Sequence, residues 1–326
     1  MSTDAPEPLV PGGPSYEAMA RLLTAVWPEM PASARFFERM DRDRAPDAPR
    51  RAVIRDPADR ERLLALVEWG KHPGRRDGAH FLMSLAVLPG HRRRGLGQRL
   101  LRLALDDLPR DAARLETSTS EDRPEAVAFL ERRGFTVQLR TQLSELDLET
   151  FDPAPISIRD LEKEGLTVRS LAGDASRDEA LLRSIHALQA ETARDAPGGD
   201  RYELEPFDRW RAMYRDNPDF LPEGHLVALD GTRVVGMTQL WASNGTPAIV
   251  YTGFTGVARS HRRRGIATVL KVRSLGWARR LRDPEGRYPV VRTGNAETNP
   301  MLQLNLRLGF RPLPARLRME RRLGAG

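Results

Sequence analysis

The pentapeptide His-Arg-Arg-Arg-Gly occurs twice in this chain, at residues 91–95 and 261–265. An apolar run precedes each copy, at 81–87 and 248–257, and a helix-like stretch follows each one. A strand, a short basic loop with glycine and a helix N-terminus together bind phosphate well. The exposed amide N–H groups and the helix dipole favour anions, and glycine lets the backbone approach the ligand. The sequence therefore predicts one strand–loop–helix anion site built twice.

Further landmarks repeat in the same order around the two loops. The offset is 170 residues between His91 and His261 and 175 residues between the Gly-Phe pairs that begin at Gly134 and Gly309. Such agreement indicates a duplicated domain. We predict a disordered leader at 1–14, an N-terminal domain at 15–150, a linker at 151–165 and a C-terminal domain at 166–326.

The periodicity of apolar residues predicts alternating helices and strands in both halves. In the first half these are a helix at 16–26, a hairpin at 51–54 and 63–69, strands at 81–87 and 114–117, a helix at 125–132 and a strand from Gly134 to Leu146. In the second half they are helices at 178–191 and 206–214, a hairpin at 226–229 and 234–240, a strand at 249–257, a helix at 267–280, a strand at 289–292, a helix at 300–308 and a final strand region.

Composition narrows the function classes. A chain of 326 residues with 40% hydrophobic and 30% charged residues fits about two globular domains. It has no apolar run long enough to span a bilayer and no signal-peptide pattern, so we expect a cytoplasmic protein. The absence of cysteine excludes disulfides, thiolate metal sites and an acyl-cysteine intermediate. A net charge of +7 suits an anionic ligand, but the interleaved acidic residues argue against nucleic acid as the partner.

At this point the residues resemble a known family. Val87-x-Pro89-x-x-Arg92-x-x-Gly95-x-Gly97 resembles the acyl-CoA pyrophosphate loop of the GNAT superfamily of N-acetyltransferases, and residues 257–267 provide a second match. The Gly-Phe pairs resemble the end of the superfamily's closing helix and the strand after it. The resemblance covers both halves, as in tandem GNAT proteins of actinobacteria. It implies two α/β domains, each with a mostly antiparallel mixed sheet that is splayed between its fourth and fifth strands and flanked by helices.

The resemblance also implies acetyl-CoA as acyl donor, a small amine as acceptor, direct transfer and no metal. We expect a monomer or homodimer and no membrane partner. The residues implied in acyl-CoA binding are Val257, Arg262, Arg263, Arg264, Gly265, Ile266, Ala267, Thr268, Asn295 and Asn299 in the second half, and Val87, Arg92, Arg94, Gly95 and Gly97 in the first.

The catalytic residues are less clearly marked. Many GNAT proteins have a tyrosine at the position of Asn305, where it can protonate the leaving thiolate, whereas asparagine can only hydrogen-bond. Neither fourth strand carries the family's usual glutamate base. The candidates for the base are Tyr251, Glu297 and His225, or a bound water. The first half has Leu130 where the second has Asn305, so we expect the second half to be the catalytic one.

The acceptor site is predicted near the first two helices of the second half. The loop there is acidic, which would suit a cationic amine, and three aromatic residues could form an apolar wall. These residues are Glu191, Asp195, Asp200, Glu203 and Glu205, with Trp210, Tyr214 and Trp241. Two alternatives stay open: a non-catalytic acyl-CoA-binding protein, and a transferase that uses another acyl-CoA in both halves. A P-loop NTPase is excluded because no Gly-Lys-Ser/Thr follows either loop, and a Rossmann loop because Leu100 and Leu270 occupy the position of its third glycine.

Overall fold

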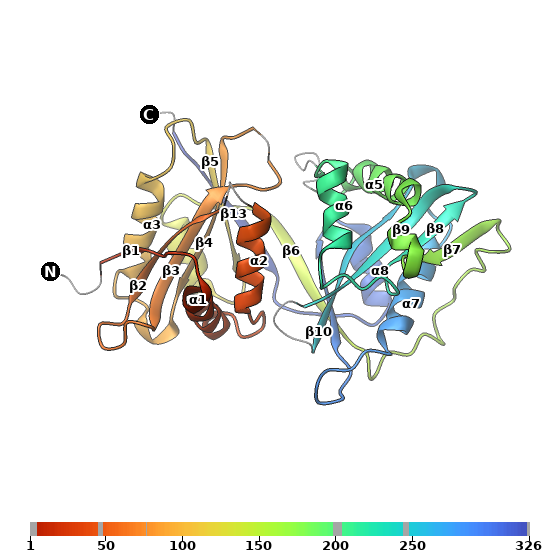
Figure 1. Ribbon diagram of the computed structural model, residues 1–326, viewed down its shortest axis with the longest axis horizontal. Helices are drawn as coiled ribbons and strands as arrows, with labels where there is room; N and C mark the ends of the chain where they lie inside the picture. Colours follow the sequence, from red (N-terminus) through yellow and green to blue (C-terminus); the bar gives the residue numbers. More distant parts are fainter. Residues whose placement is uncertain (1–4, 45–47, 76, 198–203, 244–247, 325–326) are drawn as a thin grey trace. The chain divides into compact units, whose positions relative to one another are not determined.

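The computed structural model describes residues 5–44, 48–75, 77–197, 204–243 and 248–324. These form two compact units (Figure 1). Unit 1 consists of the chain up to Gln138 together with the closing segment from Leu317. Unit 2 begins at Leu139 and ends at Arg316. The units therefore do not simply follow the two halves of the chain.

Unit 1 contains a mixed sheet with its strands in the order β1-β2-β3-β4-β5-β13. Their bounds are β1 (Glu7–Pro8), β2 (Arg50–Arg55), β3 (Leu63–Lys71), β4 (His80–Val87), β5 (Arg114–Ser120) and β13 (Arg316–Arg322). Strands β1 to β4 pair antiparallel. The next pair, β4 and β5, is parallel, and its register covers only His80–Leu82 against Arg114–Glu116. Beyond that point the two strands part.

Helices cover both faces of this sheet. They are α1 (Gly13–Val26), α2 (Ala34–Arg44), α3 (Leu96–Asp106) and α4 (Pro124–Glu131). The apolar stripe of α1, with Met19 and Leu22, packs in one core cluster with Val53 of β2. Leu100 of α3 belongs to a second cluster that includes the neighbouring Ile54. Because successive strand residues point to opposite faces, the two clusters lie on opposite sides of the sheet.

Unit 2 repeats this arrangement in the order β7-β8-β9-β10-β11-β6, with β12 also paired to β6. The strands are β6 (Thr136–Asp147), β7 (Leu166–Ser170), β8 (Leu226–Asp230), β9 (Arg233–Ala242), β10 (Ile249–Val257), β11 (Val290–Ala296) and β12 (Arg311–Pro312). The helices are α5 (Glu179–Ala193), α6 (Phe207–Arg215), α7 (Ile266–Ala278) and α8 (Pro300–Arg307). Strands β10 and β11 form the parallel pair, which covers only Ile249–Tyr251 against Val290–Arg292.

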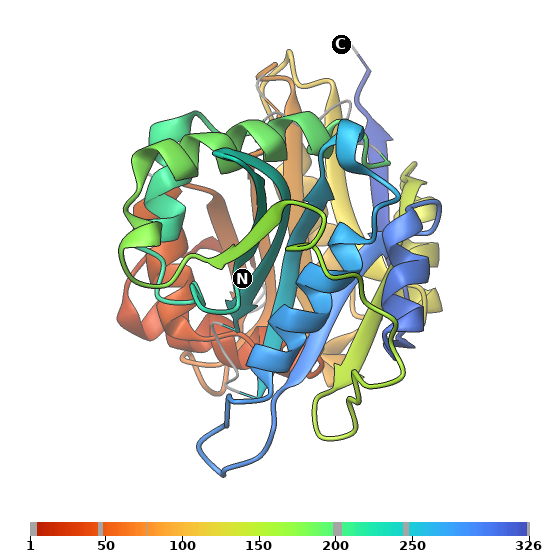
Figure 2. The same cartoon turned by 90° about the vertical axis from the view of Figure 1, so that its right-hand side faces the viewer.

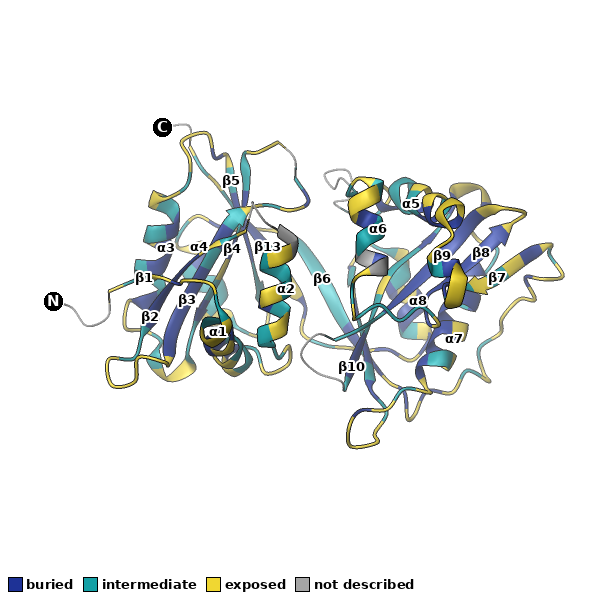
Figure 3. Cartoon of the chain, viewed as in Figure 1, coloured by how far each residue is buried: buried dark blue, intermediate teal, exposed yellow. Residues whose placement is uncertain are grey.

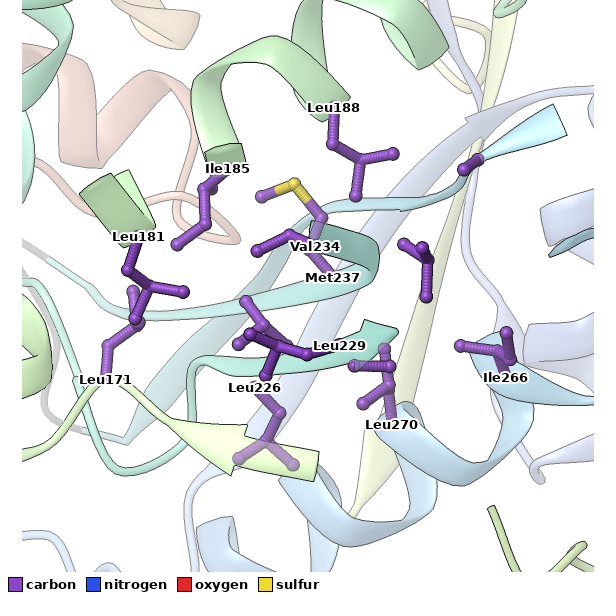
Figure 4. Packing of buried hydrophobic residues seen from close by; sticks show 14 of the residues in the cluster. Leu171, Leu181, Ile185, Leu188, Leu226, Leu229, Val234, Met237, Ile266 and Leu270 are labelled. Atoms are coloured by element: carbon purple, nitrogen blue, oxygen red, sulfur yellow. The ribbon is translucent and has the colours of Figure 1, made fainter. Parts of the chain in front are cut away.

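The main core of unit 2 lies around β8 and β9. Figure 4 shows Ile185 and Leu188 of α5 on one side of these strands and Ile266 and Leu270 of α7 on the other. Figure 2, which looks onto unit 2, shows α5 in green and α7 in blue flanking its strands. Strands β2 and β3 of unit 1 and β8 and β9 of unit 2 carry mostly buried residues, and the outer helix faces are exposed (Figure 3). The predicted fold class, a mixed sheet with helices in each unit, is confirmed.

The last strand of each sheet comes from the other half of the chain. Strand β6 pairs antiparallel with β11, from Thr141 opposite Ala296 to Asp147 opposite Val290. Strand β13, near the end of the chain, lies beside β5 in unit 1. An ion pair joins each of these strands to its neighbour in the sheet. Glu145 of β6 pairs with Arg292 of β11 at 2.7 Å, and Glu320 of β13 pairs with Arg114 of β5. The predicted division at residue 150 follows chain order, whereas the two units exchange their closing strands.

Two segments outside the predicted domains, the leader and the linker, contain packed residues. Within the predicted leader 1–14, Glu7–Pro8 pairs with β2 and Leu9 is buried, so this part is ordered because it completes the edge of the sheet. Within the predicted linker 151–165, Phe151 and Leu161 are buried. Helix α2 and strand β7 were not anticipated.

Candidate functional site

The two basic loops have nearly the same backbone conformation. Arg93 and Arg263 both have φ of 64°, and among the described residues they alone adopt positive φ without being glycine. Gly95 and Gly265 follow with φ of 80° and 78° and serve as the N-caps of α3 and α7. Such a conformation costs about 1 kcal/mol or more for arginine, so the surrounding structure must hold it in place. Both loops therefore present the first amide N–H groups of a helix in the same way.

The arginine that precedes this turn is also placed alike in both copies. Arg92 Nε donates a hydrogen bond to the carbonyl oxygen of Val87 at 3.3 Å, and Arg262 Nε donates to that of Val257 at 3.1 Å. Each bond ties the loop to the end of the preceding strand. Ile266 is buried in the core, and this anchors the start of α7. Ala267 and Thr268, the next residues of α7, are partly exposed.

The first loop opens onto a cavity of about 370 Å³ where β4 and β5 part. The predicted binding residues Val87, Arg92, Gly95 and Gly97 line it together with Thr117–Thr119, Phe129 and several further arginines. No atom lies within 4 Å of the point where a Cβ on Gly95 would stand. The predicted residue Arg94 is not among the lining residues and forms a hydrogen bond with His91 Nδ1 at 3.0 Å.

The second loop has acidic neighbours in place of open space. Asp195 pairs with Arg262 at 2.5 Å and with Arg259, and hydrogen bonds from these two guanidinium groups hold the pKa of its carboxyl well below the usual range. Glu164 pairs with Arg264 at 3.2 Å. The side chain of Arg159 lies 3.4 Å from the Cβ position of Gly265.

These contacts correct the expectation for the acidic loop 191–206. Glu191 accepts a hydrogen bond from the backbone N–H of Arg259 at 3.0 Å, so both Glu191 and Asp195 face the basic loop. Glu205 lies 3.9 Å from Arg209. Asp200 and Glu203 lie outside the described residues. The charge of the basic loop accounts for the position of the first two acids without an amine ligand.

Strand β10 carries a bulge that β4 lacks. Its register with β9 shifts between Thr252 and Thr255, which leaves Gly253 and Phe254 outside the ladder. The pairing of β3 with β4 is continuous from Ala65 opposite Val87 to Lys71 opposite Phe81. A bulge frees backbone N–H groups of the strand for other partners. The bulge in β10 thus places Gly253 and Phe254 outside the β9–β10 ladder, whereas the β3–β4 ladder has no such break.

Gln239 of β9 fixes this bulge from the facing strand. Its Oε1 accepts hydrogen bonds from the backbone N–H of Phe254 at 2.9 Å and from Trp241 Nε1 at 3.4 Å. Its Nε2 donates to the hydroxyl of Tyr214. A Cβ on Gly253 would stand 2.7 Å from both Gln239 Oε1 and Trp241 Nε1, so this close approach requires glycine.

Beside Gln239 lies a cluster of aromatic rings. The Tyr214 ring is 5.2 Å from Phe220, 5.1 Å from His225 and 5.7 Å from Trp241. Two of the three predicted wall residues, Trp210 and Tyr214, are buried in the core of unit 2. His225, one of the base candidates, is fully buried there, and neither ring nitrogen has a hydrogen-bond partner. Burial lowers its pKa to about 3, which keeps the ring neutral.

The remaining predicted residues lie on β10, on or just after β11, and on or just before α8. Asn305 is fully buried; its Nδ2 donates to Asn295 Oδ1 at 2.6 Å, and its own Oδ1 has no partner. Asn299 caps α8 by accepting a hydrogen bond from the N–H of Met301 at 2.9 Å. Glu297 is half exposed and ion-paired with Arg140. Tyr251 is partly buried on β10, in register with Trp241 of β9 and with Arg292 of β11.

Sequence reasoning missed Lys271 as well as Glu164. Lys271 of α7 is 2% exposed, its Nζ lies 5.8 Å from the Phe310 ring centre, and burial lowers its pKa to about 7. The available signal was a lysine within the apolar run 266–272, in a chain that has only two other lysines and uses arginine for the rest of its basic residues. In the part of the chain that the structure describes, no three His, Cys, Asp or Glu residues are grouped as a metal site. No described helix is long and apolar enough to cross a membrane.

Comparison with known proteins agrees with this duplicated fold. The sequence profile of the acetyltransferase (GNAT) family matches the chain twice, at residues 16–135 and 183–301. The two matches together cover well over half of the chain and include both basic loops. The protein therefore belongs to the acetyltransferase (GNAT) family, as a tandem member.

One relative and two solved structures are similar to this chain at lower sequence identity. A mycothiol acetyltransferase of Segniliparus rotundus is 32% identical over 146 residues, which is 45% of this chain and 50% of the relative, so the match spans half of that protein. A tandem GNAT protein from the clavulanic acid biosynthesis pathway is 22% identical, with a TM-score of 0.71 over 98% of this chain and 99% of that one. A GCN5-related N-acetyltransferase of Sphaerobacter thermophilus is 20% identical, with a TM-score of 0.67 over 97% and 95%. The two structures share the fold along nearly the whole chain.

Proposed function

We propose that this protein is an acetyl-CoA-dependent N-acetyltransferase that acts on a small amine by direct transfer in its C-terminal half. The β10 bulge carries this assignment. Transfer from a thioester passes through an oxyanion, which is stabilised by N–H donors that are already in position and not engaged in a sheet ladder. Strand β10 has a break in its ladder next to a basic loop, at Gly253 and Phe254, whereas the pairing of β3 with β4 is continuous. Without cysteine in the chain, an acyl-cysteine intermediate has no place in the reaction.

Several predicted residues fit the acyl donor. The N–H groups of residues 263–267 and the neighbouring arginines would hold its phosphates, and Val257 would pair with the extended arm of the donor. The buried Oδ1 of Asn305 lacks a partner. It would accept a hydrogen bond from an amide N–H of that arm while Asn295 keeps the side chain in place. Asparagine cannot protonate the leaving thiolate, so solvent would supply that proton.

For removal of the proton from the amine we propose Tyr251 and Glu297 as candidates. Tyr251 lies on the bulged strand itself, whereas Glu297 is occupied by its ion pair with Arg140. We therefore expect Tyr251→Phe to change the pH dependence of kcat and Glu297→Gln to leave this pH dependence unchanged. The opposite result would assign the base to Glu297, and no change with either variant would favour a bound water.

A second candidate function is acyl-CoA binding without chemistry, and the cavity at the first loop favours it for the N-terminal half. That half has a lined and open site but no bulge in β4. The relative from Segniliparus rotundus is named for a small molecule, mycothiol. This name supports a small acceptor for the chain as a whole.

One experiment separates these functions. Acetyl-CoA binding is measured by calorimetry, and turnover by thiol release over amines, amino sugars and peptides, for the wild type, Gly95→Glu and Gly265→Glu. We expect Gly265→Glu to abolish turnover. Gly231→Glu is the matched control, because Gly231 also has positive φ and has no atom within 4 Å of its Cβ position. Loss of turnover with Gly95→Glu alone would contradict the C-terminal assignment. Acetyl-CoA binding with no turnover on any acceptor would favour the binding protein.

A further inference from the structure

Residues 159–165 form a fixed turn beside the second loop. Leu161 is fully buried in the same core cluster as Ile266 and Leu270, which belong to the helix that follows the loop. The backbone N–H groups of Glu164 and Leu166 both donate to the carbonyl oxygen of Leu161, at 3.1 and 2.9 Å. The side chains of this turn are therefore held at a defined position against the loop.

Two of these side chains contact the loop directly. The Glu164 carboxylate lies 3.2 Å from Arg264 and 3.3 Å from Arg159, so it sits between one guanidinium group of the loop and one of the turn. The Arg159 side chain rests against Gly265, with its Cδ 3.4 Å from the Cβ position. Arg159 is thus an additional cation at the loop, and Glu164 is the anion that neutralises it.

The first loop provides an internal comparison. Its backbone has the same positive φ values, yet nothing lies within 4 Å of the Cβ position of Gly95, and the loop borders an open cavity. The first loop also has a carboxylate neighbour, because Glu125 pairs with Arg92 at 3.0 Å, whereas Glu164 at the second loop lies between two arginines. A basic loop that begins a helix attracts an anion, and here a glutamate supplies one.

We propose that the Glu164 carboxylate substitutes for a phosphate group of the acyl donor, and that Arg159 and Arg264 bind this phosphate once it displaces Glu164. The inference rests on the proposed function, because it requires acyl-CoA to bind at the second loop. The pyrophosphate as a whole, like the 3′-phosphate, carries more than one negative charge and more acceptor oxygens than a carboxylate, so either group binds the two arginines more strongly. Glu164, Arg159 and Arg264 are all partly exposed, at 27%, 59% and 35% of their side chains, and such ion pairs are weak.

The strength of these pairs sets the expected effect. Exposed pairs contribute up to about fivefold in an equilibrium constant, so Glu164 lowers the affinity for the donor without preventing its binding. Removing the carboxylate then strengthens binding by about two- to fivefold, whereas removing Arg159 weakens it by a similar factor. Both effects shrink as salt screens the charges.

The test measures acetyl-CoA affinity by calorimetry in a Gly95→Glu background. Binding at the first loop is removed there, so the measured Kd is that of the second loop. We expect Glu164→Gln to lower the Kd and Arg159→Gln to raise it, in both cases more at 50 mM than at 500 mM salt. The controls are Glu162→Gln and Arg273→Gln, because this pair joins the same turn to α7 at 2.9 Å without touching the loop. Parallel titrations with 3′-dephospho-CoA distinguish the two sources of phosphate: if the effect persists, the group is the pyrophosphate, and if it disappears, it is the 3′-phosphate.

The outcomes separate the inference from the proposed function. If Glu164→Gln leaves the Kd unchanged or raises it, or if the control variants shift it equally, the inference is overturned while turnover at the second loop still stands. If the Kd shifts as expected but no acceptor is acetylated, the inference holds and the proposed function fails. Absence of binding in both the Gly95→Glu parent and its Glu164→Gln variant overturns both.

Discussion

At the scale of single residues, two buried titratable groups pack in apolar surroundings of unit 2. Lys271 and His225 are each fully or almost fully buried, and burial alone lowers the pKa of both. A group whose charged form is disfavoured in the folded protein binds its proton more readily in the unfolded chain. Stability therefore falls as the pH drops from the ordinary pKa towards the lowered one.

For Lys271 this window lies between pH 10.5 and about 7. Lys271→Met keeps the shape of the side chain and removes the titration, so we expect the variant to be more stable. Its advantage should grow as the pH falls through the window, by up to about 1.4 kcal/mol per pH unit. Urea unfolding at pH 7.5 and 9.5 measures the difference. Lys163→Met is the control, because that side chain is 85% exposed. An advantage that is equal at both pH values would contradict the prediction.

For His225 the window lies between pH 6.5 and about 3. His225→Phe preserves an aromatic ring in contact with Tyr214 and removes two buried nitrogens that lack partners. We expect the variant to gain stability over the wild type as the pH is lowered from 7 to 5, and thermal unfolding at both pH values tests this. If His225 removes the proton during turnover, the variant would instead lose activity at pH 7 while remaining folded.

At the scale of elements, the bulge in β10 distinguishes two otherwise similar strand–loop–helix units. We expect Gly253→Ala to push Gln239 away from Phe254 and to release the bulge, because the new methyl group would stand 2.7 Å from the amide oxygen. In this case kcat should fall about tenfold or more, while the KM for acetyl-CoA changes less than twofold. Gly276→Ala on α7, where no atom lies within 4 Å, is the control. Equal losses in kcat and in acetyl-CoA affinity would indicate general damage to the strand.

The sequence predicted most elements, and it did so through apolar periodicity and the repeated loop. It placed β4, β10 and α7 to within two residues, because apolar positions mark the two strands and Gly265 marks the start of the helix. It missed α2, whose sequence is highly charged, and β1, which has only two residues. The neighbours of the second loop could not be predicted, because Glu164 and Asp195 reach it only through tertiary packing.

At the scale of the whole molecule, the exchange of closing strands makes each unit depend on both halves of the chain. A protein cut at residue 150 separates β13 from β5, and it separates β6 from β11. We expect residues 1–150 and 151–326 each to be aggregated or molten when expressed alone, because β5 or β11 is left with an unpaired edge. Co-expression should yield a 1:1 complex with cooperative unfolding. A monomeric, cooperatively folded 1–150 fragment would contradict this prediction.

This exchange also constrains how the duplicated chain can evolve. Substitutions can inactivate one loop without affecting the other, since each loop lies within its own unit. Deletion of a half is different, because it removes the closing strand of the remaining sheet. Selection on the activity of either half consequently preserves the fold of its neighbour, even where that neighbour no longer performs any chemistry.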